Sequence, residues 1–149
     1  MPLTSVHSKG IALQKGNGAS PEVFATIGGI NDMPEIMSQK STVEDTSIDD
    51  DNRHYNYGIG EPPGFTLTVF WNPDDANQTA LITEHDSETE SNYRVLCPDD
   101  SPSTTYTFKA IVTGYGTPQA GINGLLTQNF QFQLNENDDG KIVTKGTES

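Results

Sequence analysis

Alternation of apolar and polar residues is the sequence feature that most constrains how this chain folds. Between Leu126 and Leu134, the apolar residues Leu126, Phe130, Phe132 and Leu134 stand at even positions, and the polar residues Thr127, Asn129, Gln131 and Gln133 stand at the odd positions. A period of two belongs to a β-strand with one buried and one exposed face. The pattern therefore predicts a strand from Leu126 to Leu134 with its aromatic residues in a core.

Two more segments predict long strands of the same kind. From Phe65 to Trp71 the odd positions are apolar, while Thr66 and Thr68 stand between them; from Thr104 to Thr113 the apolar face is that of Phe108. The residues expected to share one core are Phe65, Leu67, Val69, Trp71, Phe108, Phe130 and Phe132. Shorter strands are predicted over 11–14, 23–27, 36–43 and 92–97.

One helix is predicted between the strands. Asn72 suits the N-cap, Pro73 the first helical position, and Asp74 and Asp75 the first turn, where acids favour the helix dipole. The helix should end near Asp86. About seven strands and one short flanking α-helix indicate a mostly β fold, a β-sandwich or barrel.

A length of 149 residues fits one domain, and no linker divides residues 1–149. The ends, 1–9 and 146–149, are predicted to be flexible because they can bury little apolar area. Residues 44–64 have no clean periodicity, and a structureless stretch of that length is usually functional or mobile.

The 44–64 loop joins two kinds of side chain. It holds an acid cluster, Glu44, Asp45, Asp49, Asp50 and Asp51, and three residues with no evident intrachain partner, Tyr55, Tyr57 and Ile59. The acids do not match a calcium-binding EF-hand loop, because His54 stands where the glycine belongs and Gly60 where the final glutamate belongs. An exposed or interface loop is the better interpretation.

Composition excludes several classes of function. Against 21 acids stand 8 bases, which gives a net charge of −13, and a groove that grips a nucleic acid backbone needs clustered lysine and arginine. No apolar run is long enough for a membrane helix, so no membrane insertion is expected. With one cysteine, Cys97, and the scattered histidines His7, His54 and His85, no nucleophilic or metal signature emerges. We expect no enzyme activity, no metal and no cofactor.

Two glycine-containing segments predict turns. Residues 16–21 lack the following helix of a phosphate-binding loop, and a strand signal follows instead. Asp139-Gly140 is a hairpin signal, with 141–144 as the returning strand.

Several segments in order resemble the major tail tube proteins of long, non-contractile phage tails. They are 10–18, 24–30, 42–46 with Asp49-Asp50, 64–73, 107–113 and the alternating strand from Leu126. The resemblance runs from about Gly10 to Leu134. The chain lacks the immunoglobulin-like C-terminal domain that some members carry.

The resemblance implies a virion protein of the phage tail, present in the host cytoplasm during assembly. Six copies would form a ring, and rings would stack into a tube that conducts genomic DNA. Six copies at −13 carry −78, and this charge would repel DNA and keep it mobile. Implied partners are tail tip or baseplate, tape measure and tail terminator proteins. A rival hypothesis is a carbohydrate-binding or adhesion β-sandwich of a phage tail, using Tyr55, Tyr57 and Tyr115.

Two surfaces follow from this reading. The loop residues Glu44, Asp45, Asp49, Asp50, Asp51, Tyr55, Tyr57 and Ile59 are expected to order when rings stack. The uncharged, hydrogen-bonding residues opposite the core are expected to line the lumen: Thr66, Thr68, Thr127, Asn129, Gln131 and Gln133. The alternative is that this polar face packs against the neighbouring subunit.

Overall fold

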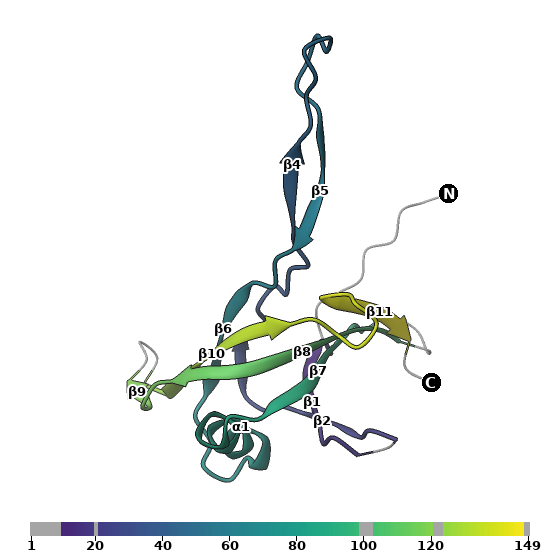
Figure 1. Ribbon diagram of the computed structural model, residues 1–149. Helices are drawn as coiled ribbons and strands as arrows, with labels where there is room; N and C mark the ends of the chain where they lie inside the picture. The colour runs from purple at the N-terminus through teal and green to yellow at the C-terminus, as the bar shows by residue number, and fades with distance from the viewer. Residues whose placement is uncertain (1–9, 20, 99–102, 121–123, 148–149) are drawn as a thin grey trace, which may run out of the picture.

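An antiparallel sheet of nine strands forms the body of the computed structural model, which describes residues 10–19, 21–98, 103–120 and 124–147 (Figure 1). Its order is β2 (Phe24–Thr26), β1 (Ala12–Gly16), β7 (Glu90–Leu96), β8 (Thr104–Tyr115), β10 (Leu126–Asn135), β6 (Gly64–Phe70) and β3 (Ile30–Asp32). In addition, β11 (Val143–Thr147) pairs with β8, and β9 (Gln119–Ala120) with β10. The predicted mostly β architecture with one helix is confirmed.

The core lies where the alternating strands predicted it. Phe130 and Leu67 are directly paired between β10 and β6, and neither is exposed. The Phe65 and Phe132 rings stack with centroids 4.8 Å apart, and Tyr93 from β7 meets Phe132 edge-on at 5.5 Å. Aromatic pairs of this kind add to the free energy gained by burial.

The first residues of β10 differ in burial from the predicted pattern. Leu126 is 42% exposed, whereas Thr127 and Gln128 are buried. Gln128 can be buried because its Nε2 donates to the Gly116 carbonyl at 2.8 Å. Here β10 pairs with β9 instead of β8. Thr127 lies on the same side of β10 as Asn129, but it is 9% exposed, so the expectation that it is accessible there is wrong.

Trp71 is also outside the core, at 40% exposure. Strand β6 ends at Phe70, and the Trp71 amide donates to the Leu126 carbonyl at 2.9 Å. The core prediction therefore fails for Trp71 at the end of the strand, where the period of two no longer applies.

A glycine corner joins the two end strands of the sheet. Since only Ile27, Gly28 and Gly29 separate β2 from β3, the sheet curls back toward itself in the manner of a barrel. The Gly29 carbonyl accepts from the Phe70 amide at 2.6 Å, and φ of Gly29 is +73°. A Cβ atom there would lie 2.9 Å from the Phe70 carbonyl oxygen, so glycine is required at this position.

Helix α1 (Ala76–Ser87) begins three residues later than predicted. Asp75 is the N-cap, and its carboxylate accepts from the amides of Asn77 and Gln78. The predicted cap, Asn72, instead accepts from the Asp74 amide at 3.0 Å within a preceding turn. Asp74 thus lies in the turn before the helix, and Asp75 is the N-cap.

Gln78 joins this helix to the glycine corner. Its side chain is 2% exposed; Nε2 donates to the carbonyls of Gly28 (2.8 Å) and Phe70 (3.1 Å), and Oε1 accepts from the Asn72 amide (3.0 Å). Gln78→Ala would leave these buried backbone groups unpaired. We expect it to lower the free energy of unfolding by about 2–4 kcal/mol, measured by urea titration.

The matched control for Gln78 is Thr83→Ala on the exposed side of the same helix. The Thr83 hydroxyl donates to the Thr79 carbonyl one turn earlier at an exposed site, so its loss should change stability by less than about 0.5 kcal/mol. Equal stability of the two variants would contradict the proposed role of Gln78.

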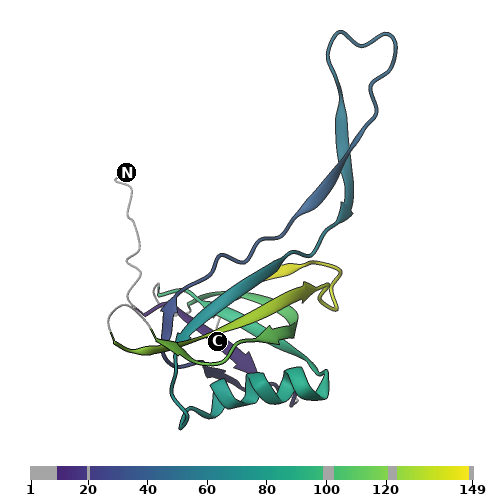
Figure 2. The ribbon, with the colours of Figure 1, turned by 90° about the vertical axis from the view of Figure 1, so that its left-hand side faces the viewer.

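A separate two-stranded sheet, β4 (Lys40–Glu44) and β5 (Tyr55–Gly60), projects from the body as a hairpin (Figures 1 and 2). The prediction that 44–64 lacks regular structure is therefore wrong. Gly58 and Gly60 interrupt the alternation of side-chain types in β5, so the sequence does not show the pattern of a strand there. A Cβ atom on Gly58 would collide with the Ser41 side chain, so the strands approach too closely for a larger residue.

The turn predictions are confirmed, with one correction. In the first turn the Asn17 amide donates to the Val23 carbonyl at 3.1 Å between β1 and β2, and in the second the Gly140 amide donates to the Asn137 carbonyl at 3.0 Å. However, the strand that follows, β11, pairs with β8 and not with β10, and it includes Gly146 and Thr147. These two residues are not a loose tail; residues 1–9 and 148–149 lie outside the described part.

Candidate functional site

A polar, uncharged surface covers β6 and β10 on the side opposite the core. The register pairs Thr66 with Gln131 and Thr68 with Asn129, and the Thr68 hydroxyl donates to Asn129 Oδ1 at 2.8 Å. Gln133 lies at the end of this row and donates to the Pro62 carbonyl at 2.7 Å. Five of the six predicted residues thus form one accessible surface, the polar face (Thr66, Thr68, Asn129, Gln131 and Gln133), and the sixth, Thr127, is buried at its end.

Helix α1 lies on the other side of the sheet from the polar face. Its Leu81 is fully buried in the same core cluster as Phe130 and Leu67. The body therefore has two distinct surfaces, one a hydrogen-bonding sheet and the other bearing the helix.

The hairpin carries an apolar face that nothing in the described chain covers. Tyr57 and Ile59 are each 83% exposed, and Tyr55 is about half exposed. The Lys40 ammonium lies 5.4 Å from the centre of the Tyr57 ring on this same face. Since an isolated two-stranded hairpin is at best marginally stable in water, this surface indicates an interaction site.

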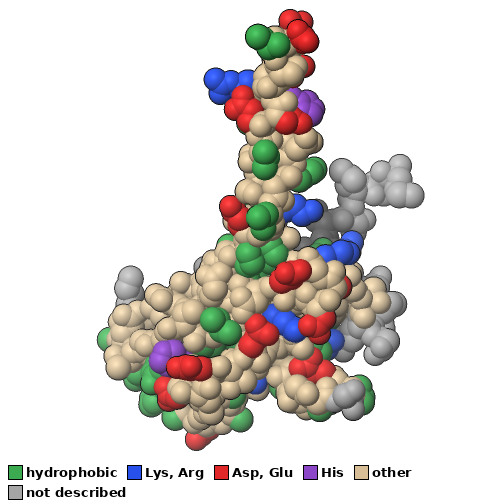
Figure 3. All heavy atoms as spheres, viewed as in Figure 1, with side chains coloured by type: hydrophobic (Ala, Val, Ile, Leu, Met, Phe, Trp, Pro, Cys, Tyr) green, Lys and Arg blue, Asp and Glu red, His purple; other side chains and the backbone are tan. Residues whose placement is uncertain are grey.

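Acidic side chains gather at the tip of the hairpin (Figure 3). The Asp45 carboxylate accepts from His54 and from the Asn56 amide group, and Asp50 accepts from the Ser47 amide at 2.7 Å. All eight predicted residues of the loop lie on this one hairpin. Among the described residues, no group of three His, Cys, Asp or Glu side chains is placed to hold a metal ion.

The three tyrosines of the rival sugar-binding hypothesis do not converge. Tyr55 and Tyr57 lie on the hairpin, whereas Tyr115 ends β8 and packs edge-on against His85 of α1 at 5.1 Å. They therefore form no common aromatic platform.

A buried polar cluster that sequence reasoning missed fixes the end of α1. Glu84 is buried and accepts from the Tyr93 hydroxyl at 2.5 Å, from the Ser91 hydroxyl, and from the Lys15 ammonium at 3.2 Å. Burial, and then the hydrogen bond to Glu84, raise the pKa of Tyr93 far above its ordinary value. The cluster ties the helix to β1 and β7; among 21 acids, nothing in the sequence marks Glu84 as buried.

No helix among the described residues combines the length and apolar character needed to cross a membrane. No protein-family model matches the sequence, and no curated protein sequence matches it.

Solved structures with the same fold cover nearly the whole chain. The tail tube of SPP1, solved by solid-state NMR and cryo-EM, has a TM-score of 0.73 at 10% identity, covering 97% of this chain and 80% of that one. The tail of the empty gene transfer agent particle, refined with C6 symmetry, gives 0.70 at 14%, covering 97% and 100%. The sheath-tube complex of the PVC extracellular contractile injection system gives 0.68 at 12%, covering 96% and 92%. The predicted tail-tube fold is therefore confirmed.

Proposed function

We propose that this chain is a structural protein whose six-membered rings stack into a phage tail tube that conducts genomic DNA. The observation that carries the proposal is the fold itself, shared over 97% of the chain with tube proteins of the SPP1 tail and of the gene transfer agent tail. The uncovered hairpin supports it, because a projecting apolar face needs a partner. Under this proposal the protein resides in the virion tail.

The polar face is proposed to line the lumen. Its side chains are uncharged and neutralise no phosphate, while the net charge of −13 per copy repels DNA. Helix α1, on the other side of the sheet, then faces outward.

The hairpin is proposed as the contact between stacked rings. Its apolar face, Tyr55, Tyr57 and Ile59, would be buried on a neighbouring copy, and its acidic tip would lie at the rim. Tail tip or baseplate, tape measure and tail terminator proteins would then contact the end rings and the lumen.

Electron microscopy of the concentrated, pure protein tests the proposal directly. We expect six-membered rings, or tubes formed by stacked rings. Particles that stay discrete at every concentration would contradict it and would favour a binding module.

The lumen assignment predicts a specific defect in genome ejection. Gln131→Lys and Gln133→Lys together would add twelve positive charges per ring. If the polar face lines the lumen, tubes should form, but ejection should slow in a salt-dependent manner because lysine holds phosphate.

The matched control for this prediction places the same charges on α1. Thr79 and Thr83 are both exposed there, and Thr79→Lys with Thr83→Lys should leave ejection unchanged. If the Gln131 and Gln133 variant folds as a monomer but forms no ring, the polar face is a subunit interface and the lumen assignment is wrong.

A further inference from the structure

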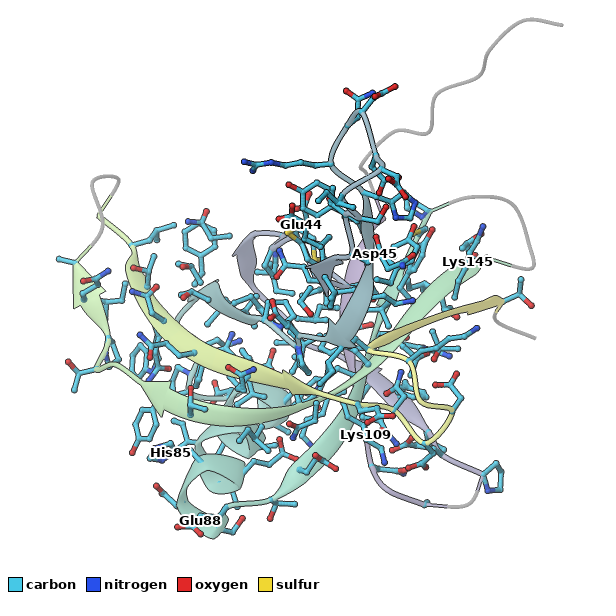
Figure 4. All side chains as sticks on the ribbon, turned by 45° about the horizontal axis from the view of Figure 1, so that its top comes forward. Glu44, Asp45, His85, Glu88, Lys109 and Lys145 are labelled. Carbon is cyan, nitrogen blue, oxygen red and sulfur yellow. The ribbon has the colours of Figure 1, made fainter. Side chains whose placement is uncertain are left out.

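A groove of about 560 Å³ separates the last turn of α1 from β8. It is lined by Ile111 and Val112 of β8 and, on the helix side, by Asp86 and Glu88. Figure 4 shows His85 and Glu88 at this end of the helix, well away from the hairpin residues Glu44 and Asp45.

The groove runs beside an open strand edge. The pairing of β7 with β8 begins at Glu90 and Ile111. Beyond that pair, Gly114 and Tyr115 pair with β10 on one side, and no described strand pairs with them on the other. An open edge of this kind is a template for an added extended segment.

Charge limits which segment can enter. Asp86 and Glu88 are exposed, and the C-terminal end of a helix adds partial negative charge. Glu84 contributes little, because Lys15 and Tyr93 already bind its carboxylate. The groove therefore favours a cationic segment and disfavours the acidic tip of a hairpin from another copy.

Residues 1–9 have the required chemistry. They include Leu3, Val6, His7 and Lys9, and the first acid of the chain is Glu22. Thr4 and Val6 favour extended backbone.

Reach favours a groove on a second copy. Residues 1–9, here called the arm, precede Gly10. Gly10 lies against Pro98, which follows β7 at the opposite end of that strand from Glu90. Extended chain from Glu90 to Pro98 spans about 26 Å, and nine residues span at most about 30 Å. The arm would have to double back, fully stretched, to enter its own groove, whereas copies arranged head to tail bring arm and groove together.

We propose that residues 1–9 of one copy bind as an extended segment in the groove between α1 and β8 of the next copy, with Lys9 near Glu88 and Val6 beside Thr113. This head-to-tail contact is heterologous and so propagates along a stack. The inference rests on the proposed tube function only in the assumption that copies stack head to tail.

A disulfide trap in the full chain tests this contact. In a Cys97→Ser background, Val6→Cys chains are mixed with Thr113→Cys chains and oxidised, and a cross-linked dimer is expected. The control mixes Val6→Cys with Thr79→Cys, an exposed position on α1 outside the groove. A yield no greater than in the control overturns the proposal. If the two cysteines placed in one chain link only within that chain, the arm binds its own groove and the proposal is also wrong.

Charge reversal provides a second readout. Lys9→Glu or Glu88→Lys alone should lower the cross-linking yield about tenfold, and the two together should restore it. Loss without restoration would contradict a direct contact between Lys9 and Glu88.

The same samples separate this inference from the proposed function. Tubes by electron microscopy without a groove cross-link would refute the arm contact and leave the tube function standing. A specific cross-link in a protein that never forms rings or tubes would do the reverse.

Discussion

Phe130→Ala should lower the free energy of unfolding by about 3–5 kcal/mol. Phe130 has no exposed surface, lies at the middle of β10 and pairs with Leu67 of β6. Truncation removes the buried ring and leaves a cavity that close-packed neighbours can fill only in part. Urea unfolding followed by circular dichroism gives the value.

The next residue, Gln131, offers the matched control for Phe130. It is exposed on the polar face of the same strand, so Gln131→Ala should change stability by less than about 0.5 kcal/mol. A loss below about 1 kcal/mol for Phe130→Ala would mean that the two faces of β10 are exchanged.

Tyr57→Ser together with Ile59→Ser should abolish tube formation while leaving the monomer folded. These side chains are the most exposed of the hairpin's apolar face and contribute nothing to the core. Their replacement therefore removes the apolar area that is proposed to be buried on a neighbouring copy. Tubes are counted by electron microscopy, and monomer stability is checked by thermal unfolding.

Val43→Ser is the control for the hairpin. Val43 is paired with Asn56, on the opposite face from Tyr57, and is also exposed. Tubes should survive this change. Hydrogen exchange adds a second measurement: residues 44–64 should gain protection on going from monomer to tube, and equal protection in both states would contradict ordering on assembly.

The strands with a strong period of two could be predicted from sequence. In β6, β8 and β10 the buried residues Leu67, Phe108 and Phe130 follow directly from alternation. The ends of these strands could not, because Trp71 and Thr127 depend on which neighbouring strand is present at that point. Alternation describes one strand and carries no information on its partners.

The hairpin and the polar contacts of α1 show two further limits. Gly58 lies close to Ser41 across the hairpin. Because glycine has no side chain, the alternation of side chains that predicts a strand is missing at this position. Gln78 and Glu84 look like surface residues of a helix, and their burial follows from contacts with Gly28 and Lys15, about fifty and seventy positions away in the chain. The polar face could be predicted because its residues alternate with core residues along β6 and β10.

The glycine corner bears on how the protein avoids aggregation before assembly. The two end strands of the sheet, joined through Ile27–Gly29, are each only three residues long. Short edge strands offer few unpaired backbone groups to a second sheet, which is one way natural proteins suppress indiscriminate sheet-to-sheet growth. Gly28 and Gly29 would then protect solubility as well as the fold, and substitutions there should increase precipitation at concentrations at which the unaltered chain stays in solution.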